Sequence, residues 1–576
     1  MFSDGLWRTS DGGRNYENIN GSGGTEPSIH YLRQTFISKV SAHPEHWERL
    51  FFAGSEGLFI SENADCENPN EVLWKKISGS HFYDIEFHPD NPDLVFASGE
   101  KMMFSEDGGL SWKRIKVPTL PDQLKYPFIR LSMEISPQYP DILWVAYTRA
   151  THFSQSTAGE AFLYKVHVST KKWEKVNSLR KGMNNMIVSR ARAFTVSPSK
   201  DSLILCGNVQ PVYRSTNLGR SFSPIVRRQM HDDIHHLEYS TDGSVLWASH
   251  DGGISKSLDN GITWNKADFG IGVANIFGMG IAQSTEEIVL YGGYDTGGNQ
   301  LDSGKWEHIN FGDGFEVAVD PFNPNYRYVT RQNGYIHHSR DGGESYEFVA
   351  SGGGSKSEWH SWFKLDPENP NLLYNSGKKV VRSSDYGDKQ EVIFDVNKYN
   401  DELLTVFKLF VSEHHPGVLY LYILDESLVN PIIVKTNNCR AKPEEIIWEE
   451  VPTSSREGWI MDLVVDKSNS NNFFVVYNDT SPSKKVLYFN GATYEDQNGN
   501  LSYLAAESLV CDEAHNRLYL GTNHGVYTKL KTELNWTLLV GLPGTYIKTM
   551  AINKVTNVLY VGTYGRGVWK TGLLQE

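Results

Sequence analysis

The strongest constraint on this fold is an internal repeat that runs through nearly the whole chain. Each copy is an apolar stretch, a polar turn rich in Pro, Asn or Asp, and a second apolar stretch that ends in a small residue. Copies lie at 82–99, 130–147, 315–330, 362–377, 508–522 and 550–563. Alternating apolar residues on both sides of a polar turn predict two short strands joined as a hairpin.

A second pattern follows these hairpins: Ser or Thr, then Asp two residues later, then Gly and an aromatic residue. The best copies lie at 9–16, 105–112, 257–264 and 339–346, with weaker ones at 215–222, where Asn217 replaces Asp, and at 383–387. The Asp carboxylate accepts backbone N–H groups in such a turn, and Gly supplies a positive φ. We therefore assign structural roles to Asp107, Asp259 and Asp341.

Two hairpins make one four-stranded unit, and the spacing of these units predicts the fold. Gly54 and Gly562 occupy equivalent places eleven repeats apart, which gives a mean period of about 46 residues, typical of propeller blades. We predict an all-β propeller with eleven complete blades and a three-stranded twelfth at 547–572. Two rings, at 1–310 and 311–576, are preferred over one large ring. The segment 5–20 is expected to pair with the last blade and close its sheet edge.

The repeated turn resembles the Asp-box, or BNR, repeat of sialidases, sortilin-type receptors and two-propeller xyloglucanases. The segments at 231–240, 250–257 and 559–572 most resemble secreted bacterial sortilin-like BNR proteins, which are often called glycosyl hydrolases. This resemblance implies an extracellular or cell-surface location. No signal peptide precedes the first repeat, so the expected location depends on the resemblance alone.

Composition excludes several classes of protein. The net charge of −14 argues against a nucleic-acid partner, which needs a basic face. No apolar run reaches the ~20 residues of a transmembrane helix. The four cysteines, Cys66, Cys206, Cys439 and Cys511, lack the close spacing of a zinc site, and we interpret them as small apolar residues.

Blade topology selects the candidate site residues. The loops between blades and those between second and third strands share one face, opposite the Asp turns, and there His, Asp and Gly gather at 231–236, 250–253, 292–298, 311–316 and 331–333. Catalytic candidates are Asp233, His235, Asp295, Asp313 and Glu316; ligand-binding candidates are His231, Asp232, Asp251, Tyr294 and Arg331. Asp233, Asp251 and Asp313 are candidate metal ligands, with Ca²⁺ the expected ion. Glycine would let a ligand approach the backbone closely, although Asp and Gly are also ordinary turn residues.

The sequence holds no complete catalytic motif. The arginine-containing element of sialidases is missing, and no carboxylate pair of a glycosidase is singled out. We therefore predict a module that binds a peptide, a protein or a glycan. The alternative is a glycan-active enzyme, either a hydrolase or a lyase with a His or Tyr base. Trp359 and Trp362 are placed to stack on a sugar ring or to pack within a blade.

Overall fold

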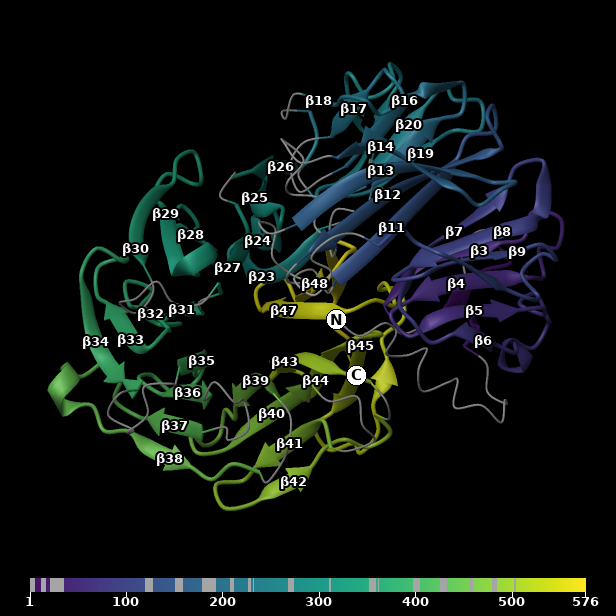
Figure 1. Cartoon of the computed structure of the whole chain (residues 1–576). Helices are drawn as coiled ribbons and strands as arrows, with labels where there is room; N and C mark the ends of the chain where they lie inside the picture. Colours follow the sequence, from purple (N-terminus) through teal and green to yellow (C-terminus); the bar gives the residue numbers. More distant parts are fainter. Residues whose placement is uncertain are drawn as a thin grey trace. The chain divides into compact units, whose positions relative to one another are not determined.

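The computed structural model confirms the predicted all-β architecture. It describes residues 6–11, 17–20, 36–119, 128–150, 159–178, 193–207, 212–225, 229–231, 233–267, 274–309, 312–351, 359–360, 362–396, 405–424, 432–454, 459–478, 484–501 and 504–575. Within these residues the chain forms eleven four-stranded sheets, one three-stranded sheet and one two-stranded sheet, all antiparallel (Figure 1). Helical structure among them is limited to short 3₁₀ turns such as η1 (Pro69–Glu71), η3 (Gln332–Gly334) and η5 (Pro443–Glu445).

The first compact unit spans Met1–Phe269, here called unit 1. Its four-stranded blades are β3(Ile37–Ala42), β4(Leu50–Gly54), β5(Gly57–Ser61), β6(Lys75–Ser78); β7(Phe82–His88), β8(Asn91–Gly99), β9(Met102–Ser105), β10(Lys113–Ile115); β11(Phe128–Ile135), β12(Ile142–Ala150), β13(Gly159–His167), β14(Trp173–Ser178); β15(Phe194–Ser197), β16(Lys200–Cys206), β17(Tyr213–Ser215), β18(Ser223–Pro224); and β19(Ile234–Tyr239), β20(Leu246–His250), β21(Gly253–Ser257), β22(Asn265–Lys266). Their first strands contact one another in chain order, so β3, β7, β11, β15 and β19 are the innermost strands.

The second compact unit spans Gly270–Glu576, here called unit 2. Its blades are β23(Asn275–Ile281), β24(Val289–Tyr294), β25(Gly297–Asp302), β26(Lys305–His308); β27(Gly314–Val319), β28(Arg327–Arg331), β29(Tyr335–Ser339), β30(Glu347–Ser351); β31(Phe363–Leu365), β32(Leu373–Asn375), β33(Lys379–Ser383), β34(Gln390–Asp395); β35(Thr405–Val411), β36(Leu419–Leu424), β37(Ile432–Thr436), β38(Glu449–Val451); β39(Trp459–Val465), β40(Phe473–Asn478), β41(Val486–Phe489), β42(Tyr494–Asp496); β43(Ala506–Asp512), β44(Arg517–Thr522), β45(Gly525–Leu530), β46(Thr537–Leu538); and β47(Ile547–Asn553), β48(Val558–Thr563), β49(Val568–Gly572).

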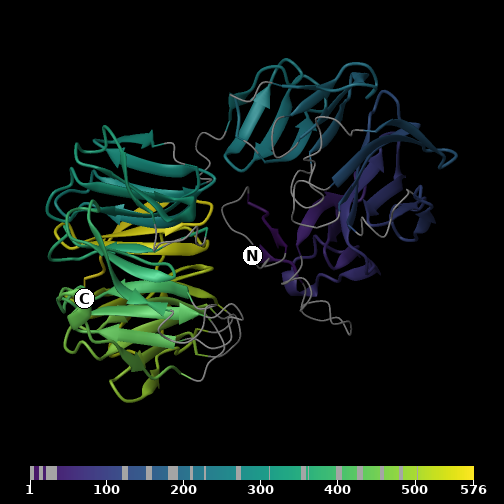
Figure 2. The ribbon, with the colours of Figure 1, turned by 60° about the vertical axis from the view of Figure 1, so that its left-hand side comes forward.

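Unit 2 is a closed ring. Its last inner strand, β47, packs against β43 and also against β23, the inner strand of its first blade. Figure 2 shows the yellow C-terminal strands beside the teal strands of that first blade. The division between the units falls at Phe269 and Gly270 rather than near residue 310, because the blade β23–β26 belongs to this second ring.

The N-terminal segment pairs differently from the expectation. β1(Trp7–Arg8) pairs with β2(Glu17–Asn18), and within the described residues β49 pairs with β48 alone. Leu6 and Ile19 pack with Trp74 on the blade β3–β6, where Trp74 Nε1 donates to Ile19 O at 2.8 Å. Burial of these apolar side chains, rather than closure of the C-terminal sheet edge, holds the segment.

The Ser-x-Asp-x-Gly turns join the third and fourth strands of their blades, as predicted. In the turn after β29, Asp341 Oδ1 accepts the Ser339 hydroxyl at 2.6 Å and the Ser345 N–H at 3.0 Å, while Gly343 N donates to Ser339 Oγ at 2.7 Å. The turns at 105–111 and 257–263 repeat this network. Hydrogen bonds from Ser339 and Ser345 hold the pKa of Asp341 below its usual range. These carboxylates are engaged in their own turns.

The hydrophobic core lies between neighbouring sheets. Tyr420 and Tyr422 of β36, for example, pack with Phe473 and Val475 of β40, and all four are fully or almost fully buried. Burial of side chains of this size stabilises each interface by about 1.5–3 kcal/mol per residue. The cysteines are all free, and Cys206 and Cys439 are buried.

Candidate functional site

Most innermost strands carry a β-bulge near their first residue. The register shifts lie at Ile37/Lys39, Phe82/Asp84 and Ile234/His236 in unit 1 and at Ile276/Gly278, Gly314/Val317, Val406/Lys408, Ile460/Asp462, Ala506/Ser508 and Ile547/Thr549 in unit 2. A bulge adds one residue to a strand and re-aims its side chains. On these strands the bulge lies beside polar side chains that line the central channel, whereas Lys364 and Glu134 line it from strands with regular register.

Six charged side chains surround the channel of unit 2, one from each of six inner strands. This channel ring consists of Glu316, Lys364, Lys408, Asp462, Glu507 and Lys548. Lys364 Nζ lies 3.1 Å from Glu316 Oε2, and Lys548 Nζ lies 2.9 Å from Glu507 Oε2. The seventh inner strand, β23, contributes Phe277 instead of a charge. Three ammonium groups thus balance three carboxylates.

Lys408 is the most buried lysine of the channel ring, with 6% of its surface exposed. Its ammonium donates to the Met461 carbonyl oxygen and lies 4.1 Å from the centroid of the Trp362 ring. Burial lowers its pKa to about 8. Within the described residues it is the one ring lysine with no carboxylate oxygen within 4 Å.

Asp462 has a structural role within the same ring. Its Oδ1 accepts the Leu463 N–H at 2.9 Å, and its Oδ2 accepts the Leu509 N–H of the next inner strand at 2.8 Å. Asp84 makes the same two contacts in unit 1, with the N–H groups of Ile85 and Met133. Each carboxylate links two neighbouring blades, so we assign neither to ligand binding.

An aromatic cluster covers the end of the unit 2 channel where the inner strands begin. This aromatic mouth consists of Phe277, Tyr294, Phe315, His360, Trp362 and Tyr564. Phe277 lies at its centre, with ring centroids 5.5–6.0 Å from those of Tyr294, Phe315, His360 and Tyr564. His360 stacks on Phe315 at 4.7 Å and contacts Trp362 at 4.3 Å. Aromatic faces with a few polar groups between them are typical of ligand sites.

Two exposed tryptophans lie near the starts of inner strands at this end of unit 2. Trp359 precedes β31 and has 53% of its surface exposed, and Trp459 is the first residue of β39, with 42% exposed. Trp359 O accepts the Asn333 N–H at 3.2 Å, and Trp459 packs edge-on against Phe407 at 5.4 Å. The backbone of Trp359 and the ring of Trp459 are thus held in place, and both residues have an open surface.

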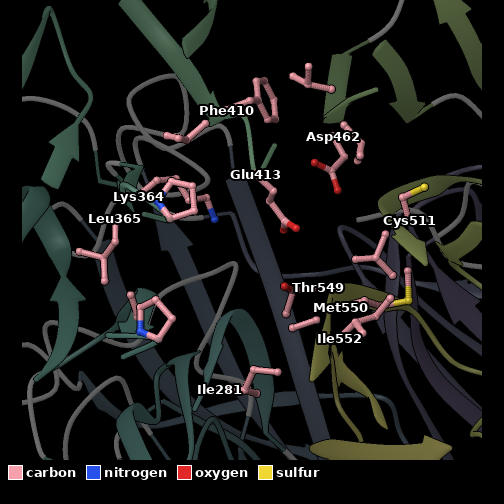
Figure 3. Close-up of a pocket in the computed structure, with 18 of the residues that line it drawn as sticks. Ile281, Lys364, Leu365, Phe410, Glu413, Asp462, Cys511, Thr549, Met550 and Ile552 are labelled. Carbon is pink, nitrogen blue, oxygen red and sulfur yellow. The ribbon is translucent and has the colours of Figure 1, made fainter. Parts of the chain in front are cut away.

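The other end of the same channel widens into a cavity of about 530 Å³ (Figure 3). Its wall combines apolar residues such as Ile281, Phe410 and Met550 with the charged Lys364 and Asp462. At its rim, Lys554 Nζ forms an ion pair with Glu413 Oε2 at 2.7 Å, between turns of two blades. Lys364 and Asp462 also line the narrow end, so the channel ring separates the two cavities.

The channel of unit 1 has a cavity of about 450 Å³ with an excess of acids. Lys39 Nζ lies 3.3 Å from Glu86 Oε1 and 3.5 Å from Asp84 Oδ1, and Glu134 lines the same cavity. Burial raises the pKa of Glu86 to about 7, and it also raises the pKa of Glu134. Lys39 is therefore the counter-ion of a group of acids.

The predicted site residues divide between the two units. In unit 1, His235 Nε2 contacts Asp251 Oδ1 and lines the channel cavity, while His231 stacks on His250 at 6.2 Å. Asp233 adopts a positive φ of 57° before β19. Asp232 lies outside the described residues. The structure thus brings His235 and Asp251 together.

The remaining predicted residues lie in unit 2, near the aromatic mouth. Tyr294 belongs to it, and Asp313 Oδ1 accepts the Asp295 N–H at 3.0 Å. Glu316 joins the channel ring, and Arg331 covers the Tyr335 ring at 5.0 Å. Within the described residues, no group of three or more His, Cys, Asp or Glu side chains could hold a metal ion, so the candidate ligands Asp233, Asp251 and Asp313 form no such group.

Two glycines of this region, Gly292 and Gly314, serve blade packing. A Cβ on Gly292 would collide with the Phe315 carbonyl of the next blade, and one on Gly314 would collide with the Gly297 carbonyl. Both glycines therefore allow the blades β23–β26 and β27–β30 to approach closely.

Sequence reasoning missed the channel ring and the acids of unit 1. The sequence contains a signal for several of them, because they are single charges within short apolar strands. Lys364, Lys408 and Lys548 interrupt the runs 362–365, 405–411 and 547–552, and Glu134 interrupts 131–135. An unpaired charge in a buried strand is costly, so such a position indicates a channel wall rather than the core.

Fold and channels together define the chain as a β-propeller protein with two compact units. It is similar to a GH74 xyloglucanase from Xanthomonas campestris (TM-score 0.59, 14% identity, 94% of this chain and 83% of that chain) and to a GH74 enzyme from Niastella koreensis (0.56, 15%, 92% and 81%). An ancestral GH74 enzyme gives a TM-score of 0.62 at 13% identity over 100% of this chain and 95% of that chain. At these identities the likeness shows the fold alone. No protein-family model matches the chain, and no curated sequence matches it. Among the described residues, no helix is long and apolar enough to cross a membrane.

Proposed function

We propose that this protein is an extracellular glycan-binding propeller whose ligand rests on the aromatic mouth of unit 2. The observation that carries the proposal is the combination of this cluster with the exposed rings of Trp359 and Trp459. Rigid aromatic faces cover the apolar faces of sugar rings at little entropic cost, and nearby polar groups accept and donate hydrogen bonds to hydroxyl groups. Asp295, Asp313 and Tyr294 supply such groups here.

The comparisons agree with this proposal without establishing it. One neighbour is a xyloglucanase, so its fold accommodates a polysaccharide. The predicted resemblance to Asp-box proteins points in the same direction, since the Ser-x-Asp-x-Gly turns have the expected hydrogen bonds. A peptide or protein ligand remains the competing interpretation, which the following experiment separates.

The test is a binding screen of the full chain on immobilised polysaccharides, followed by calorimetry. Trp359→Ala should weaken glycan binding about tenfold or more, because a stacking contact on a bound ring is lost. Trp306→Ala is the matched control, since Trp306 is 46% exposed but lies on the outermost strand β26. Absence of binding to any glycan, or equal losses in both variants, would refute the proposal.

A glycan-active enzyme is the second candidate, and the channel of unit 1 favours it. Glycoside hydrolysis needs one protonated and one ionised carboxyl group. Glu86, with its raised pKa, shares this cavity with Glu134 and forms an ion pair with Lys39. Release of reducing ends by the wild type and its loss in Glu86→Gln would support this candidate; no release from any glycan that binds would exclude it.

A further inference from the structure

We propose that the glycan bound at the aromatic mouth is acidic, and that its carboxylate enters the narrow end of the unit 2 channel with Lys408 as its counter-ion. This inference rests on the proposed function and names the substrate class of the same site. Three observations support it: a cavity at the narrow end of the channel, the pairing of the charges that line this cavity, and the different surroundings of a second buried lysine.

The narrow end of the channel holds a cavity of about 80 Å³ directly below the mouth. Phe277 and Trp362 belong both to the mouth and to the wall of this cavity, and all six side chains of the channel ring line it as well. A buried water needs about 10–15 Å³ of such space. The cavity therefore admits a carboxylate and a few waters, while the sugar ring stays among the aromatic rings above it.

Direct ion pairs engage two of the three ring lysines and leave donors of Lys408 for the ligand. Glu316 holds Lys364, and Glu507 holds Lys548 and also accepts the Tyr546 hydroxyl. Both carboxylate oxygens of Asp462 accept hydrogen bonds from backbone N–H groups. Lys408 has three donors and gives one to the Met461 carbonyl.

A carboxylate satisfies this arrangement better than a neutral or cationic group. It would accept the remaining Lys408 donors in short, charge-assisted hydrogen bonds. A cationic ligand would instead find the three carboxylates of the cavity already engaged, two by lysines and one by backbone N–H groups. His360 fits the same ligand, since its Nε2 is buried without a hydrogen-bond partner among the described residues.

A second buried lysine of the same blade, Lys435, has a structural role and serves as a comparison for Lys408. Lys435 lies on β37 of the same blade, is 3% exposed and lies over the Tyr420 ring at 5.5 Å. Its ammonium donates to two side chains, Ser470 Oγ at 3.4 Å and Asn471 Oδ1 at 2.5 Å. It lines no part of the channel cavities. Lys408, by contrast, has a single backbone acceptor and faces a cavity.

The first measurement needs no variant. Calorimetry on the full chain compares D-glucuronate and D-galacturonate with their methyl esters, and oligosaccharides of these uronates with neutral oligosaccharides of equal length. The acids should bind at least about tenfold more tightly than the esters, as expected for one charge-assisted contact. Binding of free uronate alone identifies a small carboxylate as the ligand, whereas a further gain with chain length identifies an acidic glycan.

The second measurement uses Lys408→Met with Lys435→Met as its matched control. Lys408→Met should abolish the preference for acid over ester and change the affinity for the ester less than about twofold; Lys435→Met should retain the preference. Equal binding of acid and ester by the wild type, or a preference that survives Lys408→Met, would overturn the inference. Tight binding of neutral glycans alone would overturn it while supporting the proposed function, and binding of no glycan would refute both.

Discussion

Both channels of this protein are lined by the inner strands of propeller blades, but they differ in their charges. The channel of unit 1 has more acids than lysines, and the channel of unit 2 has three of each. In unit 1, one lysine, Lys39, faces the acids Asp84, Glu86 and Glu134, and the pKa values of both glutamates rise. In unit 2, three lysines face three acids around the channel, and a lysine, Lys408, carries the lowered pKa. The inner strands thus fix where a channel residue lies, but its chemistry varies from blade to blade.

The largest expected difference between the channels is the sign of the change in the free energy of unfolding when a channel lysine is replaced. Lys408→Met should raise the free energy of unfolding by up to roughly 3 kcal/mol, because the protein no longer buries an ammonium group whose pKa is lowered by burial to about 8. Lys39→Met should lower it by roughly 2 kcal/mol, because Asp84 and Glu86 lose their counter-ion.

Thermal and urea unfolding of the full chain, with both variants side by side, measures this difference. A destabilised Lys408→Met protein would show that this lysine stabilises the ring as Lys39 does, and the contrast between the channels would then disappear.

A second prediction concerns a feature that both channels share, an aspartate that accepts hydrogen bonds from the backbones of two neighbouring inner strands. Asp84→Ala and Asp462→Ala should each destabilise the protein by about 2–3 kcal/mol, because each leaves two backbone N–H groups of adjoining inner strands without their carboxylate acceptor. The two losses should agree within about 1 kcal/mol in urea unfolding. A loss confined to one variant would mean that the inner strands of the two units are held in different ways.

The smallest expected effect is a difference in pH dependence. The folded pKa of Glu86 lies above its unfolded value, so its stabilising contribution is complete below about pH 4.5 and is lost as the pH rises through about 7. The folded pKa of Lys408 lies below its unfolded value of 10.5, so stability is gained as the pH rises from about 8 toward 10.5. The charged groups that act on Glu86 are Lys39, Asp84 and His236, and those that act on Lys408 are Asp462, Lys548, Glu507 and Glu316.

Melting temperatures between pH 5 and 10 test this difference. Glu86→Gln should flatten the acidic side of the profile, and Lys408→Met should flatten the alkaline side. Profiles that keep their shape in both variants would contradict the assignment of either group.

Predictions that depend on interactions between residues close in the sequence were accurate, and those that depend on contacts between distant residues were not. The turn at 339–346 was predictable because the side chains of Ser339 and Asp341 form hydrogen bonds within the turn itself. The packing of segment 5–20 could not be predicted, because it depends on a contact between Ile19 and Trp74, which are 55 residues apart in the sequence. The boundary near 310 was misplaced for the same reason: the blade β23–β26 joins the second ring through β47, at the far end of the chain.

The sequence by itself determined the strands, the turns and the number of blades, since each follows from alternation and spacing within about 46 residues. It also determined that Lys408, Glu507 and Lys548 are charges within apolar strands. Only the tertiary structure decided that these charges meet. Their strands are separated by up to about 140 residues, and closure of the ring around a channel is what brings their side chains to one cavity. A charge that would be intolerable in a core is stabilised there by partners that no local pattern reveals.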